Sequence, residues 1–357
     1  MPLEKFQGVE LPASADFHVH LRDGAMMELV TGTIRQGGVN TVMPNLVPPV
    51  TTVQHALDYW DKLHKIEPNV TFLMSLYLHP SITPETIIEA KRAGITGVKS
   101  YPAGVTTNSS VGVVDYASFY PVFEEMERQD LILNLHGELP SVDISTAEQD
   151  FLPTLFSLHH RFPRLRIILE HCTSAAAIEA VKSCGSTVAA TITAHHLYLI
   201  KDDWAGKDER AGDPFCFCKP VAKTPEDRLA LLRTAASGNL KFFLGTDSAP
   251  HPVQKKREEP PAAGVFTQPY ATQLVLDAFE QGCVEGVLKE ESVTREVLEG
   301  FLGGFGRAFY RVEDERKEKI TIGKRDERIM QVLKDAEGAT EVVPFRRGQR
   351  TWSVAWK

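Results

Sequence analysis

Short apolar runs rich in β-branched residues recur along the chain, and stretches with helical spacing lie between most of them. The runs predict strands at residues 15–19, 39–43, 70–78, 95–99, 131–136, 166–170, 187–193 and 241–246. The intervening stretches predict helices at residues 84–94, 119–129, 174–185 and 224–238. Thr224 before Pro225 has the pattern of an N-cap followed by proline at the first helical position.

A strand followed by a helix, repeated about eight times, indicates a parallel sheet with crossover helices. Eight such units in roughly 250 residues match a TIM-type (β/α)₈ barrel in the α/β class. An open doubly wound sheet is the alternative, but the glycine-rich phosphate loop typical of that fold is missing. We therefore expect one domain over residues 1–357, with the barrel at about 12–310 and a small C-terminal extension at about 311–357.

Two less regular segments complete this picture. Residues 253–264 are charged and proline-rich and are expected to form a surface loop. The end of the chain, VPFRRGQRTWSVAW, predicts a short strand pair packed on the barrel.

Composition narrows the functional class. The formal charge is −8 and no basic stripe is interleaved with aromatic residues, so nucleic acid is not an expected partner. The five cysteines have irregular spacing, and Cys216-x-Cys218 lacks the second pair of a zinc knuckle, so we interpret them as ordinary thiols in a reducing compartment. The N-terminus lacks the apolar core of a signal peptide and no apolar run reaches membrane-spanning length. A cytoplasmic protein without membrane contact is expected.

Residues able to bind metal lie where the expected strands end. In a parallel barrel these C-terminal strand ends form the catalytic face. The side chains in question are His18 and His20 after the first strand, Lys99 after the fourth, His136 after the fifth, His171 after the sixth and Asp247 after the last. Taken singly, each has an ordinary explanation, such as a solvated lysine, a hydrogen-bonded core histidine or a helix-capping aspartate. Their joint placement favours one metal-binding pocket.

The two histidine pairs differ in how strongly they indicate metal ligands. His18 and His20 share one face of a strand because side chains alternate there. His195 and His196 also follow a strand and compete as ligands, but we interpret them as structural or supporting residues. Lys99 needs a chemical explanation, because an ammonium group cannot ligate a metal. Carbamylation by CO₂ would convert it into a carboxylate able to bridge two metals.

The ordered motifs HVHLRDG, VMPNLVPPVTT, GVKSYPAGVTTNSS, LHGE, LEHCTS, TITAHHL and LGTDSAPH resemble the monofunctional, type II dihydroorotases of the amidohydrolase superfamily. The resemblance runs from Asp16 to about Gly264, with a weaker echo near the C-terminus. It implies a (β/α)₈ barrel with two Zn²⁺ ions per chain. It also implies the reversible conversion of (S)-dihydroorotate and N-carbamoyl-L-aspartate in de novo pyrimidine (UMP) biosynthesis.

Residue roles follow from the resemblance position by position. His18, His20 and Asp247 would hold the more buried zinc, His136 and His171 the other, and Lys99 as N6-carboxylysine would bridge them. Asp247 would also act as general base and then acid. The implied substrate contacts are Arg22, Asn45 and His251 for a carboxylate, Thr106 and Thr107 in a flexible loop, and Lys219, Ala263 and Gly264 around the ring. The position of Lys219 implies binding through its backbone.

The implied partner is a small-molecule substrate, and whether the chain forms a homodimer is left open. Two other functions are compatible with parts of the pattern. One is a different cyclic amidohydrolase, such as a hydantoinase or allantoinase, which needs no Arg-Asn-His trio for a substrate carboxylate. The other is a catalytically inactive homologue that serves as an assembly subunit, although such proteins usually lose ligands.

Overall fold

The computed structural model describes residues 2–34, 39–312 and 318–356. Eight strands form one parallel sheet in the order β11-β8-β7-β6-β5-β4-β3-β2. The strands are β2 (Ala15–Val19), β3 (Val39–Val42), β4 (Thr71–Tyr77), β5 (Gly97–Ser100), β6 (Ile132–Leu135), β7 (Arg166–Leu169), β8 (Val188–Ile192) and β11 (Phe242–Leu244). Each coincides with an expected strand, within two residues at either end.

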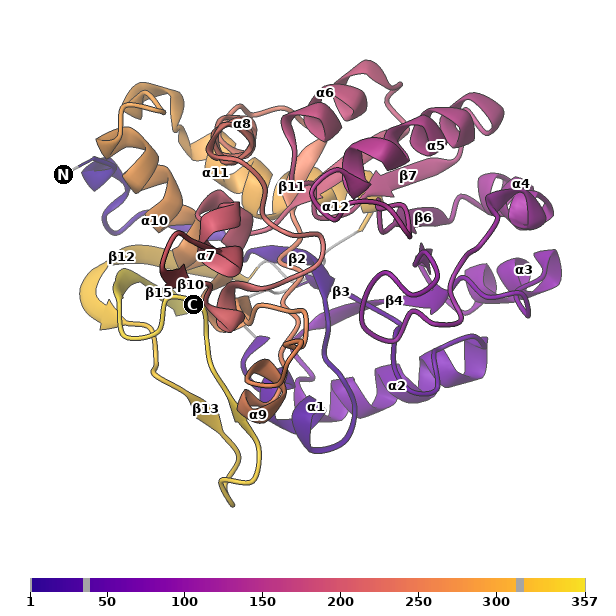
Figure 1. The fold of residues 1–357 in the computed structure, drawn as a ribbon, viewed down its shortest axis with the longest axis horizontal. Coiled ribbons are helices and arrows are strands. Elements are labelled where there is room, and N and C mark those ends of the chain that lie inside the picture. Colours follow the sequence, from indigo (N-terminus) through magenta and orange to yellow (C-terminus); the bar gives the residue numbers. More distant parts are fainter. Residues whose placement is uncertain (1, 35–38, 313–317, 357) are drawn as a thin grey trace.

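Helices surround this sheet on its outside (Figure 1). The α-helices of the described chain are α1 (Gly24–Thr31), α2 (Val53–Ile66), α3 (Pro84–Arg92), α4 (Tyr120–Gln129), α5 (Ala147–Arg161), α6 (Ala175–Ser183), α7 (Lys201–Ala205), α8 (Pro225–Ala235), α9 (Val253–Lys256), α10 (Ala271–Val284), α11 (Arg295–Glu299) and, at one end of the barrel, α12 (Phe305–Tyr310). The four expected helices correspond to α3, α4, α6 and α8, and Thr224 caps α8 in a capping box with Asp227. None of the helices in the described ranges combines the length and apolar character needed to cross a bilayer.

The sheet closes into a barrel where β2 meets the segment that follows β11. The amide of Asp247 donates to the carbonyl of His18 (2.8 Å), and the amide of His20 donates to the carbonyl of Ser248 (3.0 Å). This seam confirms the barrel and makes the open doubly wound sheet the wrong alternative.

A buried carboxylate spans the same seam. Asp16 accepts hydrogen bonds from the amide (2.8 Å) and hydroxyl (2.6 Å) of Thr246, and from the amide of His18 (3.1 Å). Burial raises the pKa of Asp16 to about 7, against the opposing effect of these hydrogen bonds. The side chain therefore ties the first strand of the barrel to the last.

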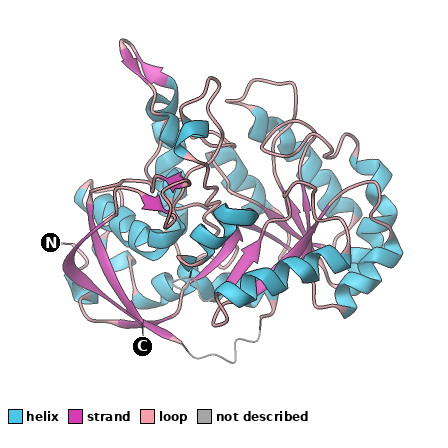
Figure 2. Cartoon of the chain, turned by 90° about the horizontal axis from the view of Figure 1, so that it is seen from below, coloured by secondary structure: helices cyan, strands magenta, loops and turns pink. Residues whose placement is uncertain are grey.

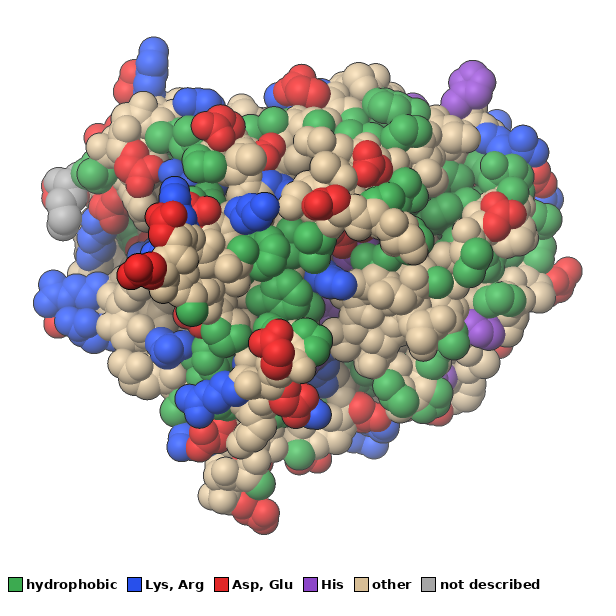
Figure 3. All heavy atoms as spheres, in the orientation of Figure 1, with side chains coloured by type: hydrophobic (Ala, Val, Ile, Leu, Met, Phe, Trp, Pro, Cys, Tyr) green, Lys and Arg blue, Asp and Glu red, His purple; other side chains and the backbone are tan. Residues whose placement is uncertain are grey.

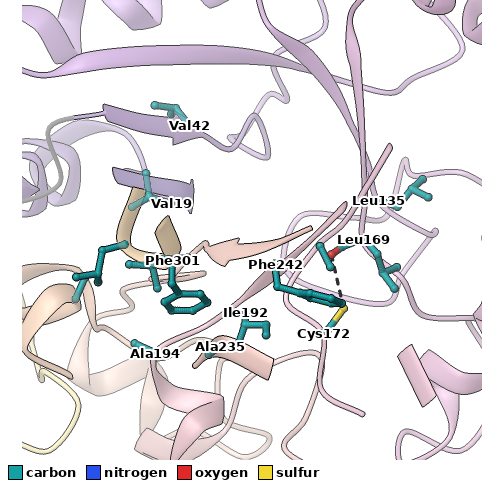
Figure 4. Packing of buried hydrophobic residues seen from close by; sticks show 14 of the residues in the cluster. Val19, Val42, Leu135, Leu169, Cys172, Ile192, Ala194, Ala235, Phe242 and Phe301 are labelled. Atoms are coloured by element: carbon teal, nitrogen blue, oxygen red, sulfur yellow. Dashed lines mark hydrogen bonds between the residues drawn. The ribbon is translucent and has the colours of Figure 1, made fainter. Parts of the chain in front are cut away.

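Apolar side chains fill both sides of the sheet. Inside the barrel Phe17 packs edge-on against Phe243 and stacks on Tyr310 of α12, so that α12 plugs the N-terminal end of the barrel. Side chains from alternate positions, such as Val19 and Phe242, belong to the larger core between sheet and helices (Figure 4). Above Phe17, polar side chains line the interior of the barrel.

The two chain ends share a separate antiparallel sheet of three strands. β12 (Lys319–Arg328) pairs with β15 (Arg350–Trp356) on one side and with β1 (Glu10–Pro12) on the other. The expected C-terminal strand pair is therefore present, but it also recruits an N-terminal strand that the sequence analysis missed. A small hairpin, β13 (Leu333–Lys334) and β14 (Glu341–Val342), projects from the body of the molecule (Figure 1). Both chain ends lie beside the three-stranded sheet, at one side of the molecule (Figure 2).

The expected surface loop at residues 253–264 is confirmed over most of its length, since residues 254, 255 and 257–260 are exposed, but its start departs from the expectation. It begins with the short helix α9, and Lys256 is 3 % exposed. Its ammonium donates to the carbonyls of Phe217 (3.0 Å), Ala262 (2.8 Å) and Gly264 (2.7 Å). The loop is therefore tied inward by a lysine that composition alone assigned to solvent.

The seam predicts a stability defect. Asp16→Ala should lower the free energy of unfolding by about 3 kcal/mol, because two buried amides lose their acceptor. Thr246→Val, which removes only a hydroxyl, should cost less. Urea titration of both variants measures the difference, and wild-type stability of Asp16→Ala would show that the seam does not depend on this side chain.

Candidate metal centre

Local irregularities in the strands aim the histidines into the barrel. The pairing of β2 with β3 shifts register between Asp16 and Val19, where three residue steps face two on the partner strand. This bulge lets Phe17 and His18 both face the interior, although neighbours on a regular strand face opposite sides. The pair His18 and His20 then follows the expected alternation.

Two of the expected ligands, His171 and Asp247, depend on a left-handed backbone. Glu170 already faces the interior, so His171 would face outward on a regular strand, and its φ of 43° turns it back. Asp247 has a φ of 46°. Gly245 lies two residues before Asp247. A Cβ atom added at Gly245 would lie only 3.0 Å from the Cβ of His18 and closer still to Thr191, so the position has no room for a side chain.

The imidazoles and Asp247 form one compact group. Ring centroids are 5.3 Å apart for His18 and His20, 5.0 Å for His18 and His171, and 4.6 Å for His136 and His171. Asp247 Oδ1 lies 3.0 Å from His20 Nε2 and 3.3 Å from His18 Nε2. The structure thus brings His18, His20 and Asp247 close enough to hold one metal ion.

Three of these imidazoles have one ring nitrogen fixed by a side-chain oxygen. His18 Nδ1 contacts Glu170 Oε2 (2.8 Å), and His20 Nδ1 contacts Asn45 Oδ1 (2.8 Å). His136 Nε2 contacts Glu138 Oε2 (2.7 Å). Such contacts are typical of metal-ligating histidines, because they fix the tautomer and leave the other nitrogen as ligand.

Several buried nitrogens in the group make no hydrogen bond within the described parts of the chain. They are His18 Nε2, His171 Nδ1 and Lys99 Nζ. An unpaired buried polar group is costly, so the donor set fits bound cations better than a dry interior. Burial also lowers the pKa values of His18 and His171, which favours the neutral imidazole that ligates metals.

Lys99 lies among these groups. It is fully buried, and Nζ is 5.1 Å from the ring centre of Tyr101. Burial lowers the pKa of Lys99, while the charges of Glu170 and Asp247 act in the opposite direction. The lowered pKa makes the neutral, nucleophilic amine more accessible, and Nζ has no hydrogen-bond partner within the described residues, so Lys99 suits a covalent modification better than a simple ion pair.

Asp247 is the charged acid of the group. Burial opposes its ionisation, but the hydrogen bond from His20 and the positive charges that His18, His20 and Lys99 carry when protonated outweigh it and lower the pKa of Asp247 to about 2. The carboxylate form is therefore the resting one.

The expected carboxylate-binding residues lie at the rim. Arg22, in the left-handed region with φ 62°, donates from Nε to the carbonyl of Pro250 (3.0 Å) and places Nη2 3.1 Å from His251 Nε2. His251 Nε2 is also 2.9 Å from the carbonyl of Ala263. Because Nε2 either accepts from Arg22 or donates to this carbonyl, it makes only one of the two hydrogen bonds at a time. Burial and the charge of Arg22 lower the pKa of His251 to about 2. A neutral imidazole therefore stands beside the guanidinium.

A loop lies over this rim. Asn45 Nδ2 donates to the carbonyl of Thr107 (3.1 Å), and Lys219 Nζ donates to the carbonyl of Val105 (2.7 Å). The sequence analysis expected only the backbone of Lys219 to matter, whereas its side chain holds the loop. Histidine atoms are visible recessed below the surface near the middle of the face in Figure 3.

The loop and the rim enclose a cavity of about 20 Å³. It is lined by His20, Arg22, Asn45, Thr106, Thr107, Lys219, Asp247, Ala249, Ala263 and Gly264. The structure thus brings together every expected substrate contact except His251, which lies behind Arg22. A Cβ at Gly264 would come within 2.2 Å of the Ala249 carbonyl, so glycine is required at this wall. The cavity holds about one water molecule, and a ring substrate needs the loop to move.

The sequence analysis missed the acceptors behind the ligands. Glu170 accepts from His18, from Thr191 Oγ1 (2.6 Å) and from Asn134 Nδ2 (2.6 Å). The motif LEHCTS contained the signal, since an acid at the end of an apolar strand needs buried partners. Glu138 in LHGE carried the same signal.

A second group of buried residues could also hold a metal ion. His195, His196 and Cys218 place one ligand atom each within 4.8 Å of the others, as His18, His20 and Asp247 do. The sequence analysis separated these residues, because His195 and His196 were assigned a structural role and Cys218 was an ordinary thiol.

Comparison with known proteins agrees with this geometry. No protein-family model matches the chain. The probable dihydroorotase of Schizosaccharomyces pombe is 48 % identical over 356 residues, covering 98 % of this chain and 99 % of the relative. The crystal structure of dihydroorotase in complex with 5-fluoroorotic acid from Saccharomyces cerevisiae has a TM-score of 0.90 at 45 % identity, covering 98 % of this chain and 99 % of that chain.

The L-hydantoinase of Arthrobacter aurescens, by contrast, is 16 % identical with a TM-score of 0.77 over 97 % of this chain and 84 % of that chain, and shares the fold alone. Identity of nearly one half over the whole length sets the fungal enzymes apart from this more distant barrel. The chain belongs to the dihydroorotase family.

Proposed function

We propose that this chain is a zinc-dependent cyclic amide hydrolase that interconverts (S)-dihydroorotate and N-carbamoyl-L-aspartate in pyrimidine biosynthesis. The observation that carries the proposal is the buried group of four imidazoles, Asp247 and Lys99 directly below a rim that offers Arg22. A hydantoin-like substrate lacks the carboxylate that such a rim would bind. Turnover of dihydroorotate but not of hydantoin by the purified chain is the decisive experiment.

Two sets of ligands would hold the metal pair. His18, His20 and Asp247 would hold one ion, and His136 with His171 would hold the other. When bound, the pair supplies a hydroxide nucleophile at neutral pH and polarises the amide carbonyl. Zinc is supported by the imidazole and carboxylate donors.

Lys99 would join the two sets after carboxylation. Its neutral Nζ forms a C–N bond to CO₂ and releases one proton, which gives an anionic carbamate. The absence of a hydrogen-bond partner at Nζ within the described residues supports this modification. The resulting carbamate would be an anionic ligand, whereas an ammonium would repel both cations.

Asp247 would move the proton. Its Oδ1 faces His18 and His20, so the other carboxylate oxygen is available to the reacting groups. It takes the proton of the attacking nucleophile and returns it to the leaving ring nitrogen, as general base and then general acid.

Arg22 would bind the carboxylate of the substrate and so position the ring. The planar guanidinium matches a carboxylate in a bidentate pair. Asn45 uses its oxygen for His20, so only its Nδ2 can turn to the substrate, by leaving the carbonyl of Thr107. Thr106 and Thr107 then close over the ring, and the backbone of Ala263, Gly264 and Lys219 lines its edge.

Two further points remain predictions from the sequence. The chain acts in the cytoplasm, and its oligomeric state, with a homodimer as the candidate, is to be measured by light scattering.

Lys99→Ala should lose or scramble the metal pair, because no anion then joins the two ligand sets. Metal analysis of the purified variant measures this loss, and a short-chain carboxylic acid added to the assay should restore part of the activity. Full activity with both metals retained would contradict the bridging role.

Asp247→Asn should retain a ligand oxygen but lose the proton carrier, so kcat should fall by about 10²–10⁴. Metal content must be measured on the same sample, since the argument applies to variant protein that keeps its metals. Turnover near that of the wild type would remove Asp247 from the proton path.

Arg22→Met should raise KM and lower kcat with metal content unchanged. A charged hydrogen bond contributes about 1.5–3 kcal/mol, so kcat/KM for dihydroorotate should fall about tenfold to a hundredfold. The control substrate is the same ring without its carboxylate, and kcat/KM for this substrate should fall far less. An equal loss on both substrates would make Arg22 a structural residue of the rim.

A further inference from the structure

A second set of soft and imidazole ligands lies outside the centre described above. His195 and His196 form the short 3₁₀ helix η4 (His195–Leu197) after β8, and Cys218 follows η5 (Pro214–Cys216). All three side chains are buried, at 0 %, 1 % and 1 % exposure. One ligand atom from each lies within 4.8 Å of the others.

The distances suit a metal ion. Cys218 Sγ and His196 Nε2 are 3.4 Å apart. Tetrahedral zinc with one thiolate and one imidazole ligand separates the two atoms by roughly 3.5 Å. His196 Nδ1 is held by Thr193 Oγ1 (2.8 Å). Its Nε2 faces the sulfur and also lies 3.2 Å from the carbonyl of Pro220, a contact that a metal ion would replace.

His195 is the observation that a hydrogen-bonded cluster does not explain. Neither of its ring nitrogens has a hydrogen-bond partner in the described parts of the chain, although the side chain is fully buried. A buried imidazole without partners is costly, and a thiol hydrogen bond between Cys218 and its neighbours leaves that cost in place. A metal ion would satisfy one of these nitrogens.

We propose that His195, His196 and Cys218 bind one further divalent zinc-type ion per chain, separate from the catalytic pair. Imidazole and thiolate together favour zinc over magnesium or calcium, which prefer oxygen ligands. Binding displaces the thiol proton, which Cys218 now donates to the carbonyl of Pro220 (3.2 Å). Three protein ligands leave the fourth tetrahedral position open.

Two charged side chains act on the site in opposite directions. Burial and the charge of Asp247 raise the pKa of the Cys218 thiol, whereas the charge of Lys256 lowers it. The ammonium of Lys256 is itself satisfied by three backbone carbonyls. The ion and the thiolate then partly cancel each other's charge in the interior.

The site would act on the pocket through the backbone. Cys218 directly precedes Lys219, whose ammonium holds the loop at Val105. The neighbouring carbonyl of Phe217 accepts from the amide of Gly264 (3.0 Å), which lines the cavity. An ion here would join the end of β8 to the segment that frames the substrate, as a structural and not a catalytic metal.

Cobalt separates the two kinds of site by spectroscopy. The chain purified with zinc should contain one more metal ion than Cys218→Ser, by atomic absorption. After exchange with Co²⁺, the wild type should show a near-ultraviolet sulfur-to-cobalt charge-transfer band, because the catalytic centre offers only nitrogen and oxygen ligands. Cys218→Ser should lose the band, whereas Cys184→Ser, which removes a thiol outside the cluster, should keep it.

His195→Gln serves if Cys218→Ser does not fold, since it removes an imidazole that makes no hydrogen bond within the described chain. It should also lose one metal ion per chain. Equal metal content in the wild type and the folded variant, with no sulfur-to-cobalt band in the wild type, would overturn the proposal. Both readouts are independent of turnover, so failure of this proposal can be distinguished from failure of the proposed dihydroorotase activity.

Discussion

The metal centre depends on closure of the barrel at the seam between β2 and the segment after β11. His18 and His20 come from one side of this seam, and Asp247 comes from the other. The amide of Asp247 donates to the carbonyl of His18, so the backbone hydrogen bonds that close the barrel also set the distance between ligands. Asp16 and Thr246 hold the same seam one layer deeper. Folding and assembly of the ligand set are therefore one event.

Burial prepares the ligands before any metal arrives. It disfavours the charged imidazoles of His18 and His171 and leaves each ring in its neutral, ligating form. The acceptors Glu170, Asn45 and Glu138 then decide which ring nitrogen points inward. Because two of these acceptors are carboxylates, they also supply negative charge next to the cations.

Much of this architecture was accessible from the sequence, because strand and helix periodicities are local signals. All eight barrel strands and the cap at Thr224 were predicted in place. The bulge in β2 and the left-handed turn at His171 were not, since both depend on what the strand must pack against. Strand β1 was missed because its partner in β12 lies about three hundred residues away.

The residues of the candidate site also fall into those that the sequence predicts and those that it does not. Its ligands could be proposed because histidine, lysine and aspartate recur at strand ends. The supporting contacts of Glu170 and the loop contact of Lys219 could not, because a single buried acid or lysine has no spacing to interpret. The burial of Lys256 could not be predicted for a related reason, since its three acceptors are backbone carbonyls that no sequence pattern marks.

The left-handed backbone at Arg22, His171 and Asp247 creates a conflict between stability and activity. Their φ values of 62°, 43° and 46° are strained for residues with side chains, and strain of this kind is retained where the surrounding structure enforces it. Glycine would relieve the backbone at each position while deleting a ligand or the guanidinium. A directed-evolution screen that scores only survival of heating would therefore drive this chain toward inactive variants, and must score turnover as well.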